Sequence, residues 1–310
     1  MAIIGLDIGG TKILGTLFDN QKKIVFKEKQ DSHAKKGFDT FMKQVYLVID
    51  IILENSSEPV KGIGIGFPGI VKGEGYVVFA PNLPVKDFDL AGHLSEKYNM
   101  LVRVGNDVNL GTYGEYCELG IDEKNVVGLF PGTGFGGGII IDSKPYVGNG
   151  FAGEIGHIVV HKDGVKCSCG NKGCLESYAS KKGILAYLRT EIKKGRKCSL
   201  KNHIKKGVLK SSKLKKAYED GDELVLESIS RFQEYFGIGI ANVLNTFNPD
   251  VIIIGGGIVD AFGDELLKKT KKVAKEYCLP GVFECTKIKQ SKLGDDAVIY
   301  GTYHLIVNNT

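Results

Sequence analysis

The chain has 310 residues, of which 43% are hydrophobic and 25% are charged. This composition excludes an intrinsically disordered chain, and no apolar run approaches the roughly 20 residues that a membrane-spanning helix needs, so we expect a folded cytoplasmic protein with two domains. The formal net charge of +5 comes mostly from lysines without interleaved aromatic residues, a pattern typical of solvated helix faces and not of a nucleic-acid-binding surface.

The first predicted element is a β-hairpin with a glycine-rich tip. Residues 3–19 read IIGLDIGGTKILGTLFD, in which one apolar strand runs into Gly9-Gly10 and a second apolar strand runs out. The backbone N–H groups of such a tip can bind phosphate oxygens, and Asp7 can hold the water shell of a Mg²⁺ ion. An ordinary hairpin turn is the alternative interpretation of this segment taken alone.

Helices and strands alternate after this hairpin. Apolar spacing predicts helices over residues 38–53, 90–98 and 108–119, and strands over 60–67 and 101–105. Asp107 follows the last of these strands, where a carboxylate is commonly a helix N-cap. Beside a phosphate site it could instead accept the proton of an attacking hydroxyl. Because the pKa of aspartate lies far below that of an alcohol, its positioning would then supply most of the rate.

The second half of the chain begins with an internal repeat. Residues 126–142, VVGLFPGTGFGGGIIID, align without gaps on residues 3–19, and the identities include Gly5, Leu6, Gly9 and Asp19, which recur as Gly128, Leu129, Gly132 and Asp142. The shared pattern predicts a second glycine hairpin, so that two tips could bind one nucleotide's phosphates from both sides. A domain boundary near Gly120 fits the repeat.

A cluster of cysteines follows the second hairpin. Cys167, Cys169 and Cys174 crowd into eight positions after His157, and one imidazole with three thiolates matches a closed, structural zinc site. Glu154 and Glu176 flank this cluster. If zinc fixes them close together, both could accept hydrogen bonds from the vicinal hydroxyls of a sugar; surface solvation is the alternative.

The last predicted elements are a long helix over residues 223–244, a buried strand over 251–254 and a helix over 264–277. Three glycines, Gly255-Gly256-Gly257, follow the strand. They could let an adenine or ribose lie against the backbone, or they could serve tight packing of strand and helix. Strands mixed with crossover helices predict an α/β protein with one sheet in each half and a ligand crevice between them.

These segments together resemble the ROK family of repressors, open reading frames and kinases. The resemblance covers nearly the whole chain, through the segments IxGxDxGGTK from Ile3, Phe67-Pro68-Gly69, Pro81-Asn82-Leu83-Pro84, Gly105-Asn106-Asp107-Val108-Asn109, Gly153-Glu154-Ile155-Gly156-His157, the cysteine cluster and Gly255-Gly256-Gly257. One departure is the polar, glycine-bearing helix after Asp107, which could alter the back wall of a sugar pocket.

The resemblance implies a two-lobed, actin-like (ribonuclease H-like) ATPase fold. Each lobe would be a mixed sheet flanked by helices, with the ligand cleft between the lobes. We expect a small lobe over residues 1–120, a large lobe with the zinc site over 121–294, and a C-terminal helix at about 295–310 that packs back on the small lobe. The family often forms dimers or tetramers, so we expect a homo-oligomer.

The resemblance also implies the roles of individual residues. The sugar would be bound by Gly69, Asn82, Asn106, Asp107, Glu154, His157 and Glu176, with Asp107 as catalytic base. ATP would be bound by Asp7, Gly9, Gly10, Thr11, Lys12, Gly132, Thr133, Gly134, Gly255, Gly256 and Gly257, with Asp7 holding Mg²⁺ through water. Structural zinc would be bound by His157, Cys167, Cys169 and Cys174.

The activity implied is transfer of the γ-phosphate of Mg-ATP to the 6-hydroxyl of glucose by a glucokinase. N-acetylmannosamine kinases and fructokinases share most of these motifs, so the hexose stays open. A sugar-responsive repressor would carry a DNA-binding segment before the first glycine motif, and a strand expected at Ala2 leaves no room for one. An actin-like or chaperone module would not need Glu154, Glu176 or the cysteine cluster. We expect neither a nucleic-acid nor a membrane partner.

Overall fold

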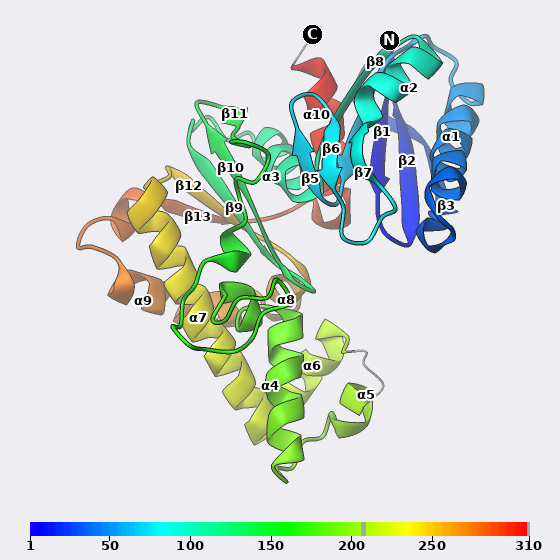
Figure 1. Cartoon of the computed structure of the whole chain (residues 1–310). Coiled ribbons are helices and arrows are strands. Elements are labelled where there is room, and N and C mark those ends of the chain that lie inside the picture. The colour runs from blue at the N-terminus through cyan, green and yellow to red at the C-terminus, as the bar shows by residue number, and fades with distance from the viewer. Residues whose placement is uncertain (206–208, 309–310) are drawn as a thin grey trace. The chain divides into compact units, whose positions relative to one another are not determined.

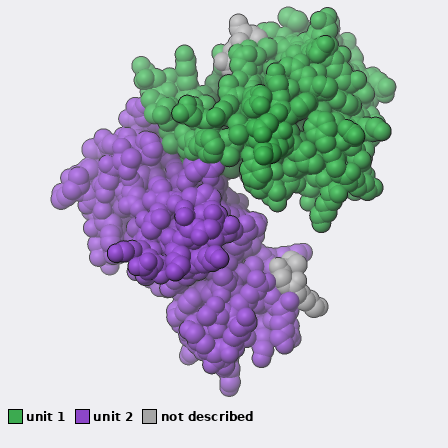
Figure 2. Space-filling model, viewed as in Figure 1, with its two compact units in different colours: residues 1–124, 138–153, 292–310 green, residues 125–137, 154–291 purple. Residues whose placement is uncertain are grey.

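The computed structural model describes residues 1–205 and 209–308. Contacts divide the chain into two units, each formed by separate stretches of sequence (Figure 2). Unit 1 comprises residues 1–124, 138–153 and 292–310, and unit 2 comprises residues 125–137 and 154–291. Within the described residues, every helix is too short or too polar to cross a membrane.

The strands and α-helices of the described residues are numbered as in Figure 1. The strands are β1 (Ala2–Ile8), β2 (Lys12–Phe18), β3 (Ile24–Asp31), β4 (Val60–Phe67), β5 (Ile70–Lys72), β6 (Tyr76–Phe79), β7 (Lys86–Asp89), β8 (Leu101–Asn106), β9 (Val126–Pro131), β10 (Phe135–Ile141), β11 (Lys144–Pro145), β12 (Val251–Ile254) and β13 (Lys287–Gln290). The helices are α1 (Phe38–Glu54), α2 (Leu90–Tyr98), α3 (Asp107–Glu118), α4 (Lys181–Lys193), α5 (Lys201–Lys205), α6 (Ser211–Glu219), α7 (Glu223–Phe247), α8 (Gly257–Phe262), α9 (Asp264–Tyr277) and α10 (Ala297–Val307).

The main sheet of unit 1 has the strand order β3-β2-β1-β4-β8. The first three strands are antiparallel, whereas β4 and β8 run parallel to β1. Alternate side chains of β1 belong to different cores: Leu6 and Ile8 pack with residues of α1 and α2, and Ile3 packs with Ile299 of α10. The sheet is therefore covered by helices on both faces, as an α/β fold requires. A small antiparallel sheet, β5-β6-β7, completes the unit.

Glycines let α10 approach its neighbours closely. A Cβ atom at Gly64 of β4 would lie 2.1 Å from the backbone oxygen of Thr302, and one at Gly114 of α3 would lie 2.2 Å from the backbone oxygen of Ala297. Neither position has room for a side chain. The glycine-bearing character of the helix after Asp107 is thus explained, at Gly114, by packing against α10.

One buried carboxylate fixes the start of the C-terminal segment. Glu115 of α3 is fully buried, and its two oxygens accept hydrogen bonds from Lys292 N at 3.1 and 3.0 Å and from Leu293 N at 2.8 Å. These bonds satisfy backbone donors just before α10 begins. The sequence had not indicated this role.

Unit 2 is built around β9, β12 and β13 with helices α4 to α9. The second sheet has the order β11-β10-β9-β12-β13, in which β12 runs parallel to both β9 and β13. All four residues of β12 are fully buried, which explains its unbroken apolar sequence. The long helix α7 begins at Asp222, whose carboxylate accepts from Leu224 N and Val225 N, and it packs against α4, α6 and α9.

The predicted α/β class and both glycine hairpins are confirmed, since each tip joins two strands. Four predicted elements have the predicted bounds, namely β4, α2, β12 and α9, and α1, β8, α3 and α7 differ by a few residues at their ends. The elements that the sequence analysis did not predict are β3, β5 to β7, β11, β13, α4 to α6 and α8. The domain boundary near residue 120 and the cellular location stay predictions.

Candidate functional site

The first glycine tip lies between β1 and β2 in unit 1. Gly9 N donates to Lys12 O at 2.8 Å and closes the turn. Burial raises the pKa of Asp7, at the end of β1, to about 6, with further contributions from the carboxylates of Asp107 and Asp295. When a half-buried carboxylate lies among other acids, a nearby cation stabilises its ionised form. Asp7 therefore fits the predicted magnesium role.

Asp107 is the first residue of α3, and the neighbouring asparagine caps the helix instead. Asn106 Oδ1 accepts from Asn109 N at 3.0 Å, whereas Asp107 Oδ1 accepts from Val108 N at 2.9 Å. The interpretation of Asp107 as the N-cap is therefore wrong, because Asn106 already satisfies that position. Its role as catalytic base stays a prediction.

Two further predicted sugar-binding residues of unit 1 adjoin these elements. Asn106 Nδ2 donates to Gly69 O at 3.0 Å. Gly69 has a φ of 155°, and a Cβ there would lie 2.4 Å from Phe79 O, so only glycine fits. Asn82 lies beside the first glycine tip, since a Cβ at Gly10 would be 3.2 Å from Asn82 Cβ. The structure thus brings Gly69 to Asn106 and Asn82 to the tip.

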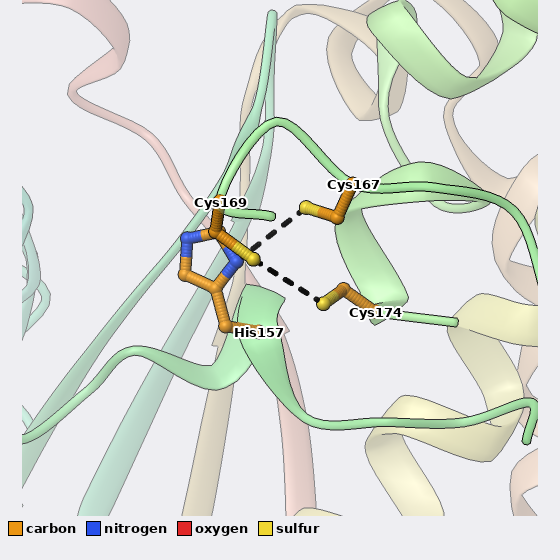
Figure 3. Close-up of side chains that lie close together, drawn as sticks. All are labelled: His157, Cys167, Cys169 and Cys174. Atoms are coloured by element: carbon orange, nitrogen blue, oxygen red, sulfur yellow. Dashed lines mark hydrogen bonds between the residues drawn. The ribbon is translucent and has the colours of Figure 1, made fainter. Parts of the chain in front are cut away.

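The imidazole and three thiols predicted to bind zinc converge in unit 2 (Figure 3). Ligand atoms of His157, Cys167, Cys169 and Cys174 all lie within 4.8 Å of one another. Cys169 Sγ is 3.7 Å from Cys174 Sγ, and Cys167 Sγ is 3.7 Å from His157 Nδ1. Two sulfurs bound tetrahedrally to zinc at about 2.3 Å lie about 3.8 Å apart. The cluster therefore fits a zinc ion in both chemistry and spacing.

The thiols of the cluster differ in their affinity for protons. Burial disfavours the thiolate of Cys167, but hydrogen bonds from Cys169, Ser177 and Cys174 outweigh it and lower its pKa to about 6. Burial is the first cause that raises the pKa of Cys174 to about 12. Since zinc binds thiolates, metal binding at neutral pH must displace the proton of Cys174.

The two predicted sugar-binding carboxylates lie on either side of the cluster. Glu154 is exposed, and its Oε2 is 3.8 Å from His157 Nε2, the ring nitrogen that does not face Cys167. Glu176 is half-buried. Its Oε2 accepts from Phe135 N at 3.0 Å, and its Oε1 accepts from Ser168 Oγ at 3.3 Å. Glu176 thus contacts the second glycine hairpin as well as the cysteine segment.

The second glycine tip and the third glycine cluster meet in unit 2. Gly132 N donates to Gly134 O at 2.9 Å. Gly256 has a φ of 98°, and a Cβ there would lie 2.9 Å from Pro131 O. The structure therefore brings together Gly132, Thr133, Gly134 and the triplet Gly255–Gly257, all of which the sequence assigned to ATP.

Three residues around the second tip were given no role in the sequence analysis. Phe135 donates to Glu176, Ser168 does the same from within the cysteine segment, and Gly156 packs so tightly that a Cβ would lie 2.4 Å from Phe135 O. In the sequence, only their positions next to other site residues could have pointed to them. Gly156 precedes His157, and Ser168 stands between two cysteines.

A cavity of about 530 Å³ lies in unit 1 beside α3. Among its lining residues are Arg103, Tyr113, Lys144 and Asn308, but Asp107 is not one of them. Asn106 is the one predicted sugar-binding residue in its lining. The cavity is therefore separate from the predicted base.

Comparison with known proteins gives a consistent result. The sequence model of the ROK family matches residues 3–309. A glucokinase of Halalkalibacterium halodurans is 34% identical over 96% of this chain and 92% of its own. A xylose repressor of Caldicellulosiruptor bescii is 32% identical over 99% of this chain and 78% of its own.

A solved structure shows the same fold. The ROK family glucokinase of Streptomyces griseus, in complex with glucose and AMPPNP, matches with a TM-score of 0.76 at 28% identity, over 98% of this chain and 99% of that one. Family match, sequence identity and fold agree. This chain therefore belongs to the ROK family and has its two-domain, actin-like α/β fold, with mixed sheets flanked by helices.

Proposed function

We propose that the protein is an ATP-dependent hexose kinase that transfers the γ-phosphate of Mg-ATP to the 6-hydroxyl of glucose. The observation that supports this most is the pairing of Asp7 with Asp107. Asp7 of β1 pairs with Gly66 of β4, and Gly66 pairs with Gly105 of β8. Asp107 follows Gly105 by two residues, so both carboxylates lie at the same end of the sheet, where the charge of Asp107 raises the pKa of Asp7. Phosphoryl transfer from Mg-ATP needs one carboxylate that attracts a cation and a second one that can accept a proton. Asp7 would be the first of these, and Asp107, at the start of α3, the second.

In the proposed reaction, the oxygen of the sugar hydroxyl attacks the γ-phosphorus. The new O–P bond forms while the bond to the β–γ bridging oxygen breaks, and ADP leaves. The proton of the hydroxyl passes to the carboxylate of Asp107 late in the reaction, because an aspartate is a weak base towards an alcohol. Magnesium, held by Asp7 through water, would neutralise charge on the phosphates.

The residues on either side of Asp107 fix its position. Asn106 caps α3 and also donates to Gly69 O, so its amide is fixed from two sides. Asp107 accepts from Val108 N through Oδ1, and a carboxylate has a second oxygen that can accept from a substrate hydroxyl. Positioning of this kind supplies catalysis without a strong base.

The glycine tips would bind the phosphates of ATP through backbone N–H groups. Gly10 and Thr11 in unit 1 and Gly132 to Gly134 in unit 2 form these tips, and Gly255 to Gly257 lie against the second one. In unit 2, Glu154, His157 and Glu176 would bind sugar hydroxyls. The four zinc ligands would hold these side chains in place and would take no part in bond making.

A phosphorylation screen tests the proposal. Zinc-loaded protein with Mg-ATP is offered glucose, mannose, fructose, N-acetylglucosamine and N-acetylmannosamine, ADP release is followed, and the product is identified by ³¹P NMR. We expect the highest kcat/KM with glucose and a 6-phosphate product. Preference for another hexose would correct the substrate, as relatives named N-acetyl-D-glucosamine kinase are 30% identical. No turnover with any of the five would contradict the proposal.

A sugar-responsive repressor is the second candidate, because xylose repressors are as similar to this chain as glucokinases are. A repressor needs to bind a sugar but needs no phosphoryl transfer. Calorimetric binding of a sugar without ADP release would therefore favour it. A homo-oligomer also stays a prediction, which light scattering can test.

A further inference from the structure

The segment that zinc would close also contacts the second glycine tip from two directions. We call residues 156–176 the zinc loop, since it contains the four ligands, and residues 132–134 the second tip. Phe135 directly follows the tip as the first residue of β10. We infer that the zinc loop sets the conformation of the second tip through the peptide groups of Phe135, so that zinc occupancy controls nucleotide binding as well as sugar binding.

The first contact comes from the C-terminal end of the zinc loop. Glu176 lies two residues after the ligand Cys174 and accepts the N–H of Phe135 at 3.0 Å. A Cβ at Gly134 would lie 2.4 Å from Glu176 Oε2, so glycine at this position is what admits the carboxylate. Ser168, between two zinc ligands, donates to the other oxygen of Glu176 at 3.3 Å and ties it to the loop.

The second contact comes from the N-terminal end of the zinc loop. Gly156 precedes the ligand His157, and a Cβ on it would lie 2.4 Å from Phe135 O. Phe135 thus donates its N–H to one end of the loop, and its C=O packs closely against the other end, where glycine leaves room for it. Its ring is held as well, by an edge-to-face contact with Phe236 of α7 at 5.7 Å.

The remaining bonds of the second tip also originate next to the zinc loop. Lys181 N donates to Gly132 O at 3.0 Å, and Lys182 N donates to Thr133 O at 3.1 Å. These donors open α4, whose N-cap Ser180 donates its hydroxyl to Glu176 O at 2.7 Å. The carbonyls of the tip are therefore held by a helix start that is bonded to Glu176.

Loss of zinc would weaken the link between the two ends of the loop. Without the metal, backbone hydrogen bonds still join these ends, among them Leu175 N to Ile158 O at 2.9 Å, but the four side chains would no longer be held to one ion. Gly156 and Glu176 could then shift more easily, and the N–H groups of the tip would lose part of their common orientation. Loops that lose such a constraint regain conformational entropy, which must be given up again when a ligand binds. Nucleotide affinity would fall although no zinc ligand touches the nucleotide.

The test is nucleotide binding in the absence of sugar, and it rests on the proposed function. Zinc is removed with a chelator, the chelator is removed by gel filtration, Mg²⁺ is restored, and AMPPNP is titrated by calorimetry. We expect zinc-free protein to bind AMPPNP about tenfold more weakly, a factor typical of coupled sites, and added zinc to restore the affinity. Equal affinity with and without zinc would overturn the inference.

Variants separate the coupling from a general loss of folding. Glu176→Ala in the zinc-loaded protein should keep its zinc yet weaken AMPPNP binding, and Glu176→Gln should recover most of the affinity, because its amide oxygen can still accept from Phe135 N. Ser230→Ala is the matched control. It removes a hydroxyl that accepts from Lys269 on α9 and should leave AMPPNP affinity unchanged.

A double-mutant cycle decides whether zinc and Glu176 act along one route. If they do, removing zinc from Glu176→Ala should weaken AMPPNP binding far less than removing it from the wild type. Strictly additive losses would overturn the inference. If the zinc-loaded wild type does not bind AMPPNP at all, the proposed kinase function is wrong. Failure of the inference and failure of the proposed function therefore give different results.

Discussion

Replacing Asp7 with asparagine should stabilise the ligand-free protein, although Asp7 is predicted to hold the Mg²⁺ of Mg-ATP through water. Burial first, and the carboxylates of Asp107 and Asp295 next, raise the pKa of Asp7 from 3.8 to about 6. An acid whose pKa is raised by folding binds its proton more tightly in the folded state. Stability therefore falls as pH rises through this window and is constant above it.

The size of the effect follows from the shift. One pKa unit corresponds to about 1.4 kcal/mol, so ionised Asp7 costs the folded state on the order of 3 kcal/mol at pH 8. Asp7→Asn removes this charge at similar volume. The variant should be more stable than the wild type by up to about 3 kcal/mol at pH 8, and the gain should shrink towards zero near pH 4.

Urea unfolding of both proteins between pH 4 and pH 8 measures this difference. The exposed Asp122→Asn is the matched control and should change stability little at any pH. A gain for Asp7→Asn that does not vary with pH, or a loss of stability at pH 8, would refute the reasoning. With Mg-AMPPNP present the order should reverse, because the wild type alone retains the carboxylate that favours the cation.

The remaining predictions concern packing, a buried carboxylate and the metal. Gly114→Ala should destabilise unit 1 by about 2 kcal/mol or more, because the new Cβ would lie 2.2 Å from Ala297 O. Gly111→Ala, one turn earlier, should be neutral or stabilising, because the nearest atom would lie 3.7 Å from its Cβ. Thermal unfolding that ranks the two variants the other way would contradict this prediction. Glu115→Ala should lower the free energy of unfolding in urea by about 2–5 kcal/mol, because it leaves the backbone N–H groups of Lys292 and Leu293 without this acceptor. Glu115→Gln should lower it less. Equal losses for the two variants would argue against the acceptor role. Zinc binding at pH 7 should release at least the proton of Cys174, whose pKa is raised to about 12, mainly by burial. Calorimetry in buffers of different ionisation enthalpy measures this release. A heat of binding that does not depend on the buffer would count against a site made of thiolates.

The elements predictable from sequence are those with a strong local signal. β12 is an unbroken run of four apolar residues. In α9 the buried residues follow helical spacing between exposed lysines, namely Leu266, Leu267, Thr270 and Ala274. β13 and the small sheet β5-β6-β7 escaped because their strands are short and half-exposed. Their pairing depends on partners elsewhere in the chain, which local propensity does not encode.

The candidate site shows the same division. The cysteine cluster was predictable because three cysteines in eight positions are rare without a metal. The N-cap of α3 was not, since Asn106 and Asp107 are both good capping residues and only the helix geometry shows which one caps. Contacts of Glu176 with Phe135 and of Glu115 with Lys292 join residues 41 and 177 positions apart, and no local pattern marks such pairs.

The central claim is that Asp107 accepts the proton of the sugar hydroxyl during phosphoryl transfer. It is tested most directly by the kcat of Asp107→Asn for ADP release with glucose and Mg-ATP, with the glucose affinity of the same sample measured by calorimetry. We expect kcat to fall by roughly a hundredfold or more, while glucose binding and zinc content are largely retained. Turnover close to that of the wild type would contradict it.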